Sequence, residues 1–268
     1  MHPGAFGDPT VAGAFADDAY ATAKGFVRTR VLHRQLVEHL PAPPAAVLDV
    51  GGGAGHQSLQ LAEIGYHVTL LDPSPAMLDK ARERLARLDP AARERVALIE
   101  APGESAGAAT GGRVFDGVLC HGVLGYLDRP DPMVAELCRL AAPGGIVSIM
   151  TGNAATMALR PALEGRWGDA LAAFDSDREI GVLGVPARAD TVESLSNLLR
   201  AGGVEPVARY GVWLFVDLLE FGASRALDDS ALNDPAQWPA IAEVEFEASR
   251  RDPYRQLSRV FHLVGRKA

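Results

Sequence analysis

The chain has 268 residues, 48% of them hydrophobic and 22% charged, the length and composition of one large α/β domain or of a domain with a cap. Acidic residues outnumber basic ones by 34 to 26, and the net charge of −8 argues against a broad nucleic-acid-binding surface. The two cysteines, Cys120 and Cys138, are too few for a disulfide framework or a zinc cluster, and no metal site is predicted. Because the sequence shows neither a signal segment nor a long uninterrupted apolar run, we expect a cytoplasmic protein without membrane contact.

Two helices are predicted before the first strand. Residues 10–21 place Val11, Ala14 and Phe15 at helical spacing, and residues 25–40 carry a longer apolar stripe that a proline-rich segment ends.

The segment 46–72 predicts a strand, a glycine-rich turn, a helix and a second strand. Gly51, Gly52 and Gly53 allow a sharp turn and a close approach to a ligand, and Asp72 ends the second strand 21 residues after Gly51. A helix start behind such a turn, with a carboxylate at the tip of the next strand, is typical of a nucleotide-binding βαβ unit whose acid binds ribose hydroxyls.

The details of the turn favour one ligand. A dinucleotide fingerprint starting at Gly51 requires Gly or Ala at position 56, where this chain has His56. Asp49 would repel a pyrophosphate but suits a cationic ammonium or sulfonium group. On these residues the segment resembles the first motif of class I S-adenosylmethionine-dependent methyltransferases, which implies S-adenosylmethionine as the cofactor; another Rossmann-like ligand is the alternative.

The rest of the chain continues an alternating pattern of helices and strands up to the fifth strand. Ser74 is the predicted cap of the helix that follows Asp72, and His121 ends the fourth strand, where acceptor chemistry sits in this fold. The expected elements are a helix at 74–88, strands at 93–100, 115–121 and 146–150, and a helix at 130–142.

After the fifth strand, residues 151–177 predict a helical insertion that builds an acceptor cap. A helix at 191–199, a sixth strand at 207–215, a helix at 234–249 and a last strand at 258–265 follow.

A tighter resemblance covers residues 15–266. The chain is similar to the carboxymethoxyuridine tRNA carboxyl methyltransferases, which esterify an oxyacetate on a wobble uridine. The matching motifs are Y-A-T-A-K-G at 20–25, L-D-V-G-G-G at 48–53, C-H-G-V-L at 120–124, A-P-G-G-I-V-S at 142–148, G-N at 152–153 and D-P-Y-R-Q-L-S-R at 252–259.

The resemblance implies an α/β Rossmann-like fold with a seven-stranded, mostly parallel sheet and an antiparallel last strand. It also implies a helical lid at residues 1–40 over a methyltransferase domain at 41–268, with a helical cap inserted at about 152–188 after strand five.

The residue types and the resemblance together predict two sets of site residues. Arg28 is expected to pair with the cofactor carboxylate, Glu104 to accept from the adenine amine, and His121 to contact the methionine moiety or act as a base. The complete cofactor set is Arg28, Asp49, Gly51, Gly52, Gly53, Asp72, Gly103, Glu104 and His121, and the acceptor set is Tyr20, Tyr126, Asn153, Trp213 and Phe215.

The chain departs from the tRNA-modifying family where phosphates would bind. Asp175, Asp177 and Glu179 surround Arg178 in place of a strongly basic loop, and the residues 211–216 replace a basic pair with apolar and aromatic side chains. Without those cations, phosphate contacts and a ligand carboxylate lose their charge-assisted partners.

The leading hypothesis is therefore methyl transfer to an oxygen or nitrogen of a small-molecule acceptor. The alanine-, glycine- and arginine-rich composition is typical of GC-rich bacteria, where such enzymes often tailor secondary metabolites. Two alternatives stay open: a tRNA wobble-base carboxyl methyltransferase, which the charge disfavours, and a non-catalytic regulator that binds S-adenosylmethionine. The sequence leaves the oligomeric state open.

Overall fold

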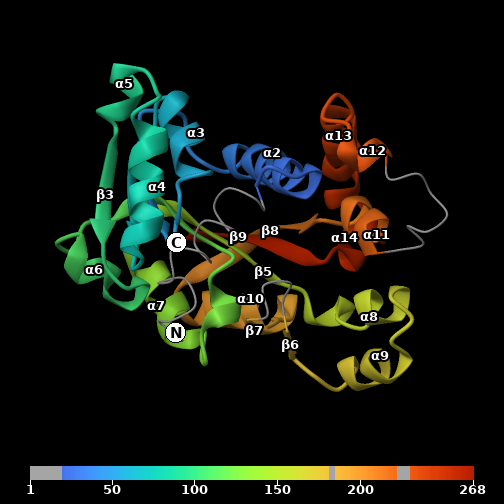
Figure 1. Ribbon diagram of the computed structural model, residues 1–268. Coiled ribbons are helices and arrows are strands. Elements are labelled where there is room, and N and C mark those ends of the chain that lie inside the picture. The colour runs from blue at the N-terminus through green and yellow to red at the C-terminus, as the bar shows by residue number, and fades with distance from the viewer. Residues whose placement is uncertain (1–19, 181–184, 222–229) are drawn as a thin grey trace.

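Short, continuous apolar runs form the strands at the centre of the protein, because both faces of a mostly parallel sheet are covered by helices. The computed structural model describes residues 20–180, 185–221 and 230–268 (Figure 1). The helix expected at 10–21 lies outside these residues except for its last two positions.

Within these ranges, seven strands form the main sheet in the order β3-β2-β1-β4-β5-β9-β8. The first five strands along the chain pair in parallel, and β9 runs antiparallel to both of its neighbours, which confirms the predicted sheet. The strands are β1 (Ala46–Val50), β2 (His67–Asp72), β3 (Val96–Glu100), β4 (Phe115–His121), β5 (Ala141–Gly152), β8 (Val204–Val212) and β9 (Val260–Lys267).

One face of the sheet is covered by α2 (Ala23–Val37) and α3 (Ser58–Glu63), and α13 (Trp238–Ser249) packs against α2 (Figure 1). Leu36 of α2 packs among Val47, Leu119 and Val264, side chains from three strands. Thr22 caps α2, since its hydroxyl accepts from the backbone N–H of Gly25. This packing holds the start of α2 beside the carboxyl ends of the central strands.

The opposite face is covered by α7 (Asp131–Leu140) and α10 (Val192–Ala201). Their apolar residues form the larger core with Leu48, Val118 and Val147 of the central strands. Thr191 and Ser194 form a reciprocal cap at the start of α10. Three further helices flank the first strands: α4 (Pro75–Leu85), capped by Ser74 as predicted, α5 (Pro90–Arg93), which contacts α3, and α6 (Ala106–Ala109), which contacts α7. The 3₁₀ turns η2 (Gly103–Ser105) and η3 (Leu124–Tyr126) follow β3 and β4.

The insertion after β5, called the cap below, is helical as predicted but ends in a hairpin that the sequence did not indicate. It comprises η4 (Ala154–Thr156), α8 (Leu159–Leu163), α9 (Trp167–Ala173), β6 (Arg178–Ile180) and β7 (Pro186–Arg188). The two short strands pair antiparallel as a separate sheet. The helices α11 (Phe215–Phe221), α12 (Ser230–Asn233) and α14 (Tyr254–Leu257) complete the chain.

Several boundaries differ from the prediction for local reasons. The third strand begins at Val96, because Pro90–Arg93 forms a helical turn, and the sixth strand ends at Val212, not at Phe215. Trp213 adopts a left-handed backbone with φ of 63°, which breaks the strand and lets Phe215 start a helix. No helix within the described ranges has the length and apolar character that crossing a bilayer requires.

Candidate functional site

The glycine turn lies between β1 and α3, at the carboxyl edge of the sheet. Gly51 has φ of +72°, and a Cβ atom there would stand 2.4 Å from Cγ2 of Val123. The backbone N–H of Gly51 donates to Leu71 O over 2.7 Å, which ties the turn to the end of β2. The turn therefore needs glycine for both its backbone conformation and its packing.

Asp72, at the end of β2, lies beside this turn. Its carboxylate accepts from the backbone N–H of Gly53 and of Ser74, each over 2.9 Å. Burial raises the pKa of Asp72, and the two backbone donors oppose that shift. A carboxylate held in this way still has lone pairs that can accept hydrogen bonds from further donors, such as the hydroxyls of a ribose.

Asp49 is the most deeply buried acid of the site, with 2% of its surface exposed. Ser58 Oγ donates to its Oδ2 atom over 2.6 Å. Burial raises the pKa of Asp49 from 3.8 to about 6, while Ser58 and Arg28 lower it and Asp72 raises it further. An acid desolvated to this extent gains strongly from a cationic neighbour, so the site favours a ligand with a positive charge.

Arg28 extends from α2 into the same region and donates from Nη1 to the hydroxyl of Tyr20. Its positive charge lowers the pKa values of Asp49, His121 and Tyr126, so Arg28 lies in their electrostatic neighbourhood. A Cβ atom built at Gly122 would lie 3.6 Å from Nη2 of Arg28. The structure thus brings a cation from the N-terminal helix to the ends of β1 and β4.

His121 ends β4 and is 9% exposed. Its Nε2 atom bonds Ser148 Oγ over 2.9 Å, whereas its Nδ1 atom is buried with no hydrogen-bond partner among the residues that the structure describes. Burial, followed by the charges of His262 and Arg28, lowers the pKa of His121 well below 6.5. The ring is therefore a neutral imidazole with one unused nitrogen, a hydrogen-bond acceptor more than a strong base at neutral pH.

Gly103 and Glu104 form the turn η2 next to the end of β3. A Cβ atom at Gly103 would stand 2.4 Å from Cε of Met133 and 2.8 Å from Cγ1 of Val50, so the backbone passes close to the core. Glu104 is exposed, and its charge contributes to the raised pKa of Cys120. The loop expected to hold adenine thus borders the same strand ends.

Two of the five residues expected at the acceptor site gather around Arg28. The ring of Tyr20 stacks on that of His56, with centroids 3.4 Å apart and planes 7° from parallel. Tyr126 lies on η3, where burial raises the pKa of its phenol and Arg28, Glu179 and Tyr20 influence it. Of the two, Tyr126 lies on the turn that contacts β7 of the insertion.

The other three have contacts that belong to the framework of the fold. Both amide hydrogens of Asn153 are engaged by the backbone carbonyls of Gln256 and Ser258. Trp213 donates from its indole to Lys24 O over 2.9 Å and packs in the core beside α2. The ring centroid of Phe215 lies 6.0 Å from that of Tyr254. Their placement at an acceptor stays a prediction without support from these contacts.

Sequence reasoning missed three buried polar residues that are linked to His121: Gln35, Ser148 and His262. Ser148 and His262 interrupt apolar stretches of β5 and β9, and Gln35 lies on the buried face of α2 beside Val31, Leu32 and Leu36. Their hydrogen bonds form a continuous series that ends at His121.

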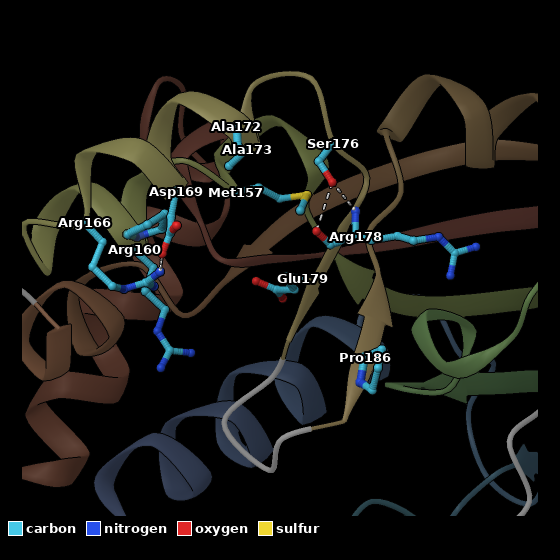
Figure 2. A pocket seen from close by; sticks show the side chains of 11 residues that line it. Met157, Arg160, Arg166, Asp169, Ala172, Ala173, Ser176, Arg178, Glu179 and Pro186 are labelled. Atoms are coloured by element: carbon cyan, nitrogen blue, oxygen red, sulfur yellow. Dashed lines mark hydrogen bonds and ion pairs between the residues drawn. The ribbon is translucent and has the colours of Figure 1, made fainter.

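The cap forms an open pocket of about 470 Å³ between the helices α8 and α9 and the β6–β7 hairpin (Figure 2). Met157, Pro161 and Ala172 give it apolar walls, and Arg166 and Glu179 place charges on it. Figure 2 shows the side chains of both helices and of the hairpin around this space.

Comparison with known proteins agrees with this geometry. Residues 48–147 match the model of a methyltransferase domain. The tRNA 5-carboxymethoxyuridine methyltransferase of Escherichia coli (strain K12) is 26% identical over 96% of this chain and 94% of that protein.

Two solved methyltransferase structures share the fold. The CcbJ methyltransferase from Streptomyces caelestis superposes with a TM-score of 0.62 at 18% identity, covering 97% of this chain and 99% of that one. The glycopeptide N-methyltransferase MtfA, complexed with S-adenosylmethionine, has a TM-score of 0.56 at 14% identity, covering 89% and 94%.

The residues fit this cofactor, because three features lie at one edge of the sheet: a buried acid, a glycine turn with no room for a side chain at Gly51 or Gly52, and a buried imidazole nitrogen with no partner in the described part of the chain. On the domain match and the full-length relative, the chain is an S-adenosylmethionine-dependent methyltransferase.

Proposed function

We propose that the protein transfers a methyl group to an oxygen or nitrogen of a small-molecule acceptor in secondary metabolism. The observation that carries this proposal is the pairing of cations around the cap pocket. Arg166 pairs with Glu164 and Asp169, and Arg160 pairs with Glu164 over 3.0 Å. A polyanion would have to displace these acids, whereas a small acceptor would not.

Two further cations of this region are paired with acids in the same way. Arg259 donates from Nη2 to Glu179, a residue of the pocket wall. Arg188 of β7 donates to Asp190 Oδ1 over 2.5 Å. These ion pairs reduce the positive charge that a phosphate would meet near the pocket.

We assign the cofactor set to specific roles within this proposal. Arg28 holds the cofactor carboxylate, Asp49 attracts its cationic end through the glycine turn, and Asp72 accepts from the ribose hydroxyls. Gly51, Gly52 and Gly53 give the backbone its close approach, while Gly103 and Glu104 border the adenine.

When bound, the cofactor supplies an electrophilic methyl group on a sulfonium. The chain's own contribution is to position the acceptor, exclude water and hold a lone pair at His121 Nδ1. Positioning can supply most of the rate enhancement of such a displacement. Tyr20 and Tyr126, beside Arg28, are the acceptor contacts that the geometry supports best.

The domain boundaries are part of the proposal. Residues 1–40 act as a lid over the methyltransferase domain at 41–268, and residues 152–188 act as the cap that selects the acceptor. Arg28 on α2 and the pocket between α9 and the hairpin support these two assignments.

Methylation of a tRNA wobble carboxymethoxyuridine is the second candidate. The observation that favours it is the similarity to the Escherichia coli tRNA enzyme along 96% of the chain.

Methyl-labelled S-adenosylmethionine, incubated with the protein and an extract of the source cells, decides between the two. The extract is split into total RNA and a low-molecular-weight fraction. We expect label in the small-molecule fraction, and none with an Asp49→Asn control. Label in RNA that mild base removes, as it would remove a methyl ester, would replace the proposal with the tRNA reaction.

A further inference from the structure

Four buried polar side chains form a hydrogen-bonded series across the sheet beneath α2. Gln35 on α2 contacts His262 on β9, His262 contacts Ser148 on β5, and Ser148 contacts His121 on β4. The distances are 2.9 Å from Gln35 Oε1 to His262 Nδ1, 2.7 Å from His262 Nε2 to Ser148 Oγ, and 2.9 Å from Ser148 Oγ to His121 Nε2. We call this series the relay.

The direction of the first bond is set by a backbone carbonyl. The amide nitrogen of Gln35 donates to Gly211 O over 3.2 Å, and a carbonyl can only accept. The amide oxygen of Gln35 must therefore face His262. His262 must therefore donate a proton from Nδ1 to this oxygen, which leaves its Nε2 atom as an acceptor in the neutral ring.

The remaining bonds follow from proton counting. His262 is neutral at ordinary pH, since burial lowers its pKa to about 3. Its Nε2 lone pair then takes the single hydroxyl proton of Ser148. Ser148 has only lone pairs left for His121, so His121 donates from Nε2, and Nδ1 is its unprotonated nitrogen.

That nitrogen is the buried His121 atom without a partner among the described residues, at the carboxyl end of β4. We propose that Gln35, His262 and Ser148 are positioning residues that hold His121 in its Nε2–H tautomer, so that the Nδ1 lone pair receives an N–H or O–H donor at the methyl-transfer site. The donor is either the ammonium of the cofactor or the protic group of the acceptor. The tautomer assignment stands independently of the proposed acceptor class.

Burial is the main reason why both rings of the relay are neutral. It lowers the pKa of His121 and of His262, and Arg28 and His39 add smaller effects in the same direction. Tyr210 stacks on His262, and its hydroxyl is engaged by His39 Nε2 over 2.7 Å and by Glu38 Oε2 over 3.0 Å. A neutral His121 can lie beside a sulfonium or ammonium without repelling it.

The first test reads the tautomers directly in the cofactor-free protein. Histidine labelled at its ring nitrogens gives widely separated nitrogen chemical shifts for protonated and unprotonated positions, and His121→Asn and His262→Asn variants assign the two rings. We expect His121 protonated at Nε2 and His262 protonated at Nδ1. Protonation of His121 at Nδ1, or of either ring at both nitrogens at neutral pH, would overturn the proposal.

Two variants test the direction of the relay. Ser148→Ala should change the ring-nitrogen chemical shifts that report the tautomer of His121 only, because Gln35 still fixes the tautomer of His262. Gln35→Met, which is similar in length but has no hydrogen-bonding amide, should change the ring-nitrogen chemical shifts of both His262 and His121. Ser249→Ala is the matched control: it removes another buried hydroxyl, which donates to Phe246 O, and should alter neither ring. A Ser148→Ala variant that changes His262 and spares His121 would contradict the direction.

Function is read from the same variants. If the donor is the cofactor ammonium, Ser148→Ala weakens cofactor affinity in calorimetry about tenfold, the range of one hydrogen bond to a charged group. If the donor belongs to the acceptor, cofactor affinity stays within about twofold and methyl transfer to the small-molecule fraction falls about tenfold. Unchanged affinity together with unchanged transfer would remove the relay from the site.

Discussion

At the residue scale, Asp49 is a buried acid whose ionised form destabilises the folded protein when no cationic ligand is bound. Its pKa is raised from 3.8 to about 6 by burial, so the folded protein binds this proton more tightly than the unfolded chain does. Between these two pH values, the stability that Asp49 contributes is present at the acidic end and is lost as the pH rises. Above pH 6 the folded protein therefore holds an ionised, desolvated carboxylate that a cationic ligand would stabilise.

We predict that Asp49→Asn stabilises the cofactor-free protein at pH 7 by about 1 to 3 kcal/mol while it abolishes cofactor binding. The amide can still accept from Ser58 but carries no charge to desolvate. Thermal melts from pH 4 to pH 8 and calorimetry with the cofactor check both halves. Equal stability of the two proteins at pH 7, or unaltered cofactor affinity, would contradict the role given to Asp49.

At the element scale, the turn after β1 depends on contacts as well as on backbone conformation. Gly51 and Gly53 both have positive φ, at +72° and +54°. A Cβ atom added at Gly51 would lie 2.4 Å from Val123, whereas a Cβ atom added at Gly53 would have its nearest neighbour, Met77 Sδ, at 3.9 Å. The two positions therefore separate the strain of a left-handed residue from a steric clash.

We expect Gly53→Ala to lower the free energy of unfolding by about 1 to 2 kcal/mol, the cost of placing a Cβ atom in the left-handed region. Gly51→Ala should lower it further and displace Val123, which precedes η3 and Tyr126. Denaturant titrations measure the difference. If both variants lost the same free energy of unfolding, the close contact with Val123 would relax without destabilising the protein.

At the scale of the whole molecule, the net charge of −8 and the paired arginines of the cap act together. Glu164 alone neutralises two cations, Arg160 and Arg166, and these exposed pairs add little to stability. Removing this acid should change the surface potential of the cap more than it changes the fold.

We predict weak tRNA binding by the unmodified protein, and tighter binding by Glu164→Gln with a steeper salt dependence, by roughly one unit of slope for each additional phosphate that the variant neutralises. Fluorescence anisotropy with labelled tRNA at several salt concentrations measures this change. Glu205→Gln, which frees Arg200 away from the cap, is the matched control. Tight, steeply salt-dependent binding by the unmodified protein would favour the tRNA candidate.

The sequence by itself determined the features that are local in the chain. The glycine turn, the acid that ends β2, the cap at Ser74 and the alternation of strands and helices depend on neighbours a few residues apart, so patterns of residue type reveal them. The resemblance of motifs then supplied the sheet and the cofactor.

Only the tertiary structure decided the polar interior and the roles of several aromatic side chains. Two hydrogen bonds of the relay join residues that are far apart in the chain: Ser148 and His262 are separated by 114 positions, and Gln35 and His262 by 227. No local pattern in the sequence encodes such pairs. Trp213 and Phe215 suit an acceptor pocket by composition, but the backbone reversal at Trp213 turns this segment toward α2 and α14. Burial, which sets the pKa values of Asp49 and His121, exists only once the sheet and α2 have closed over them.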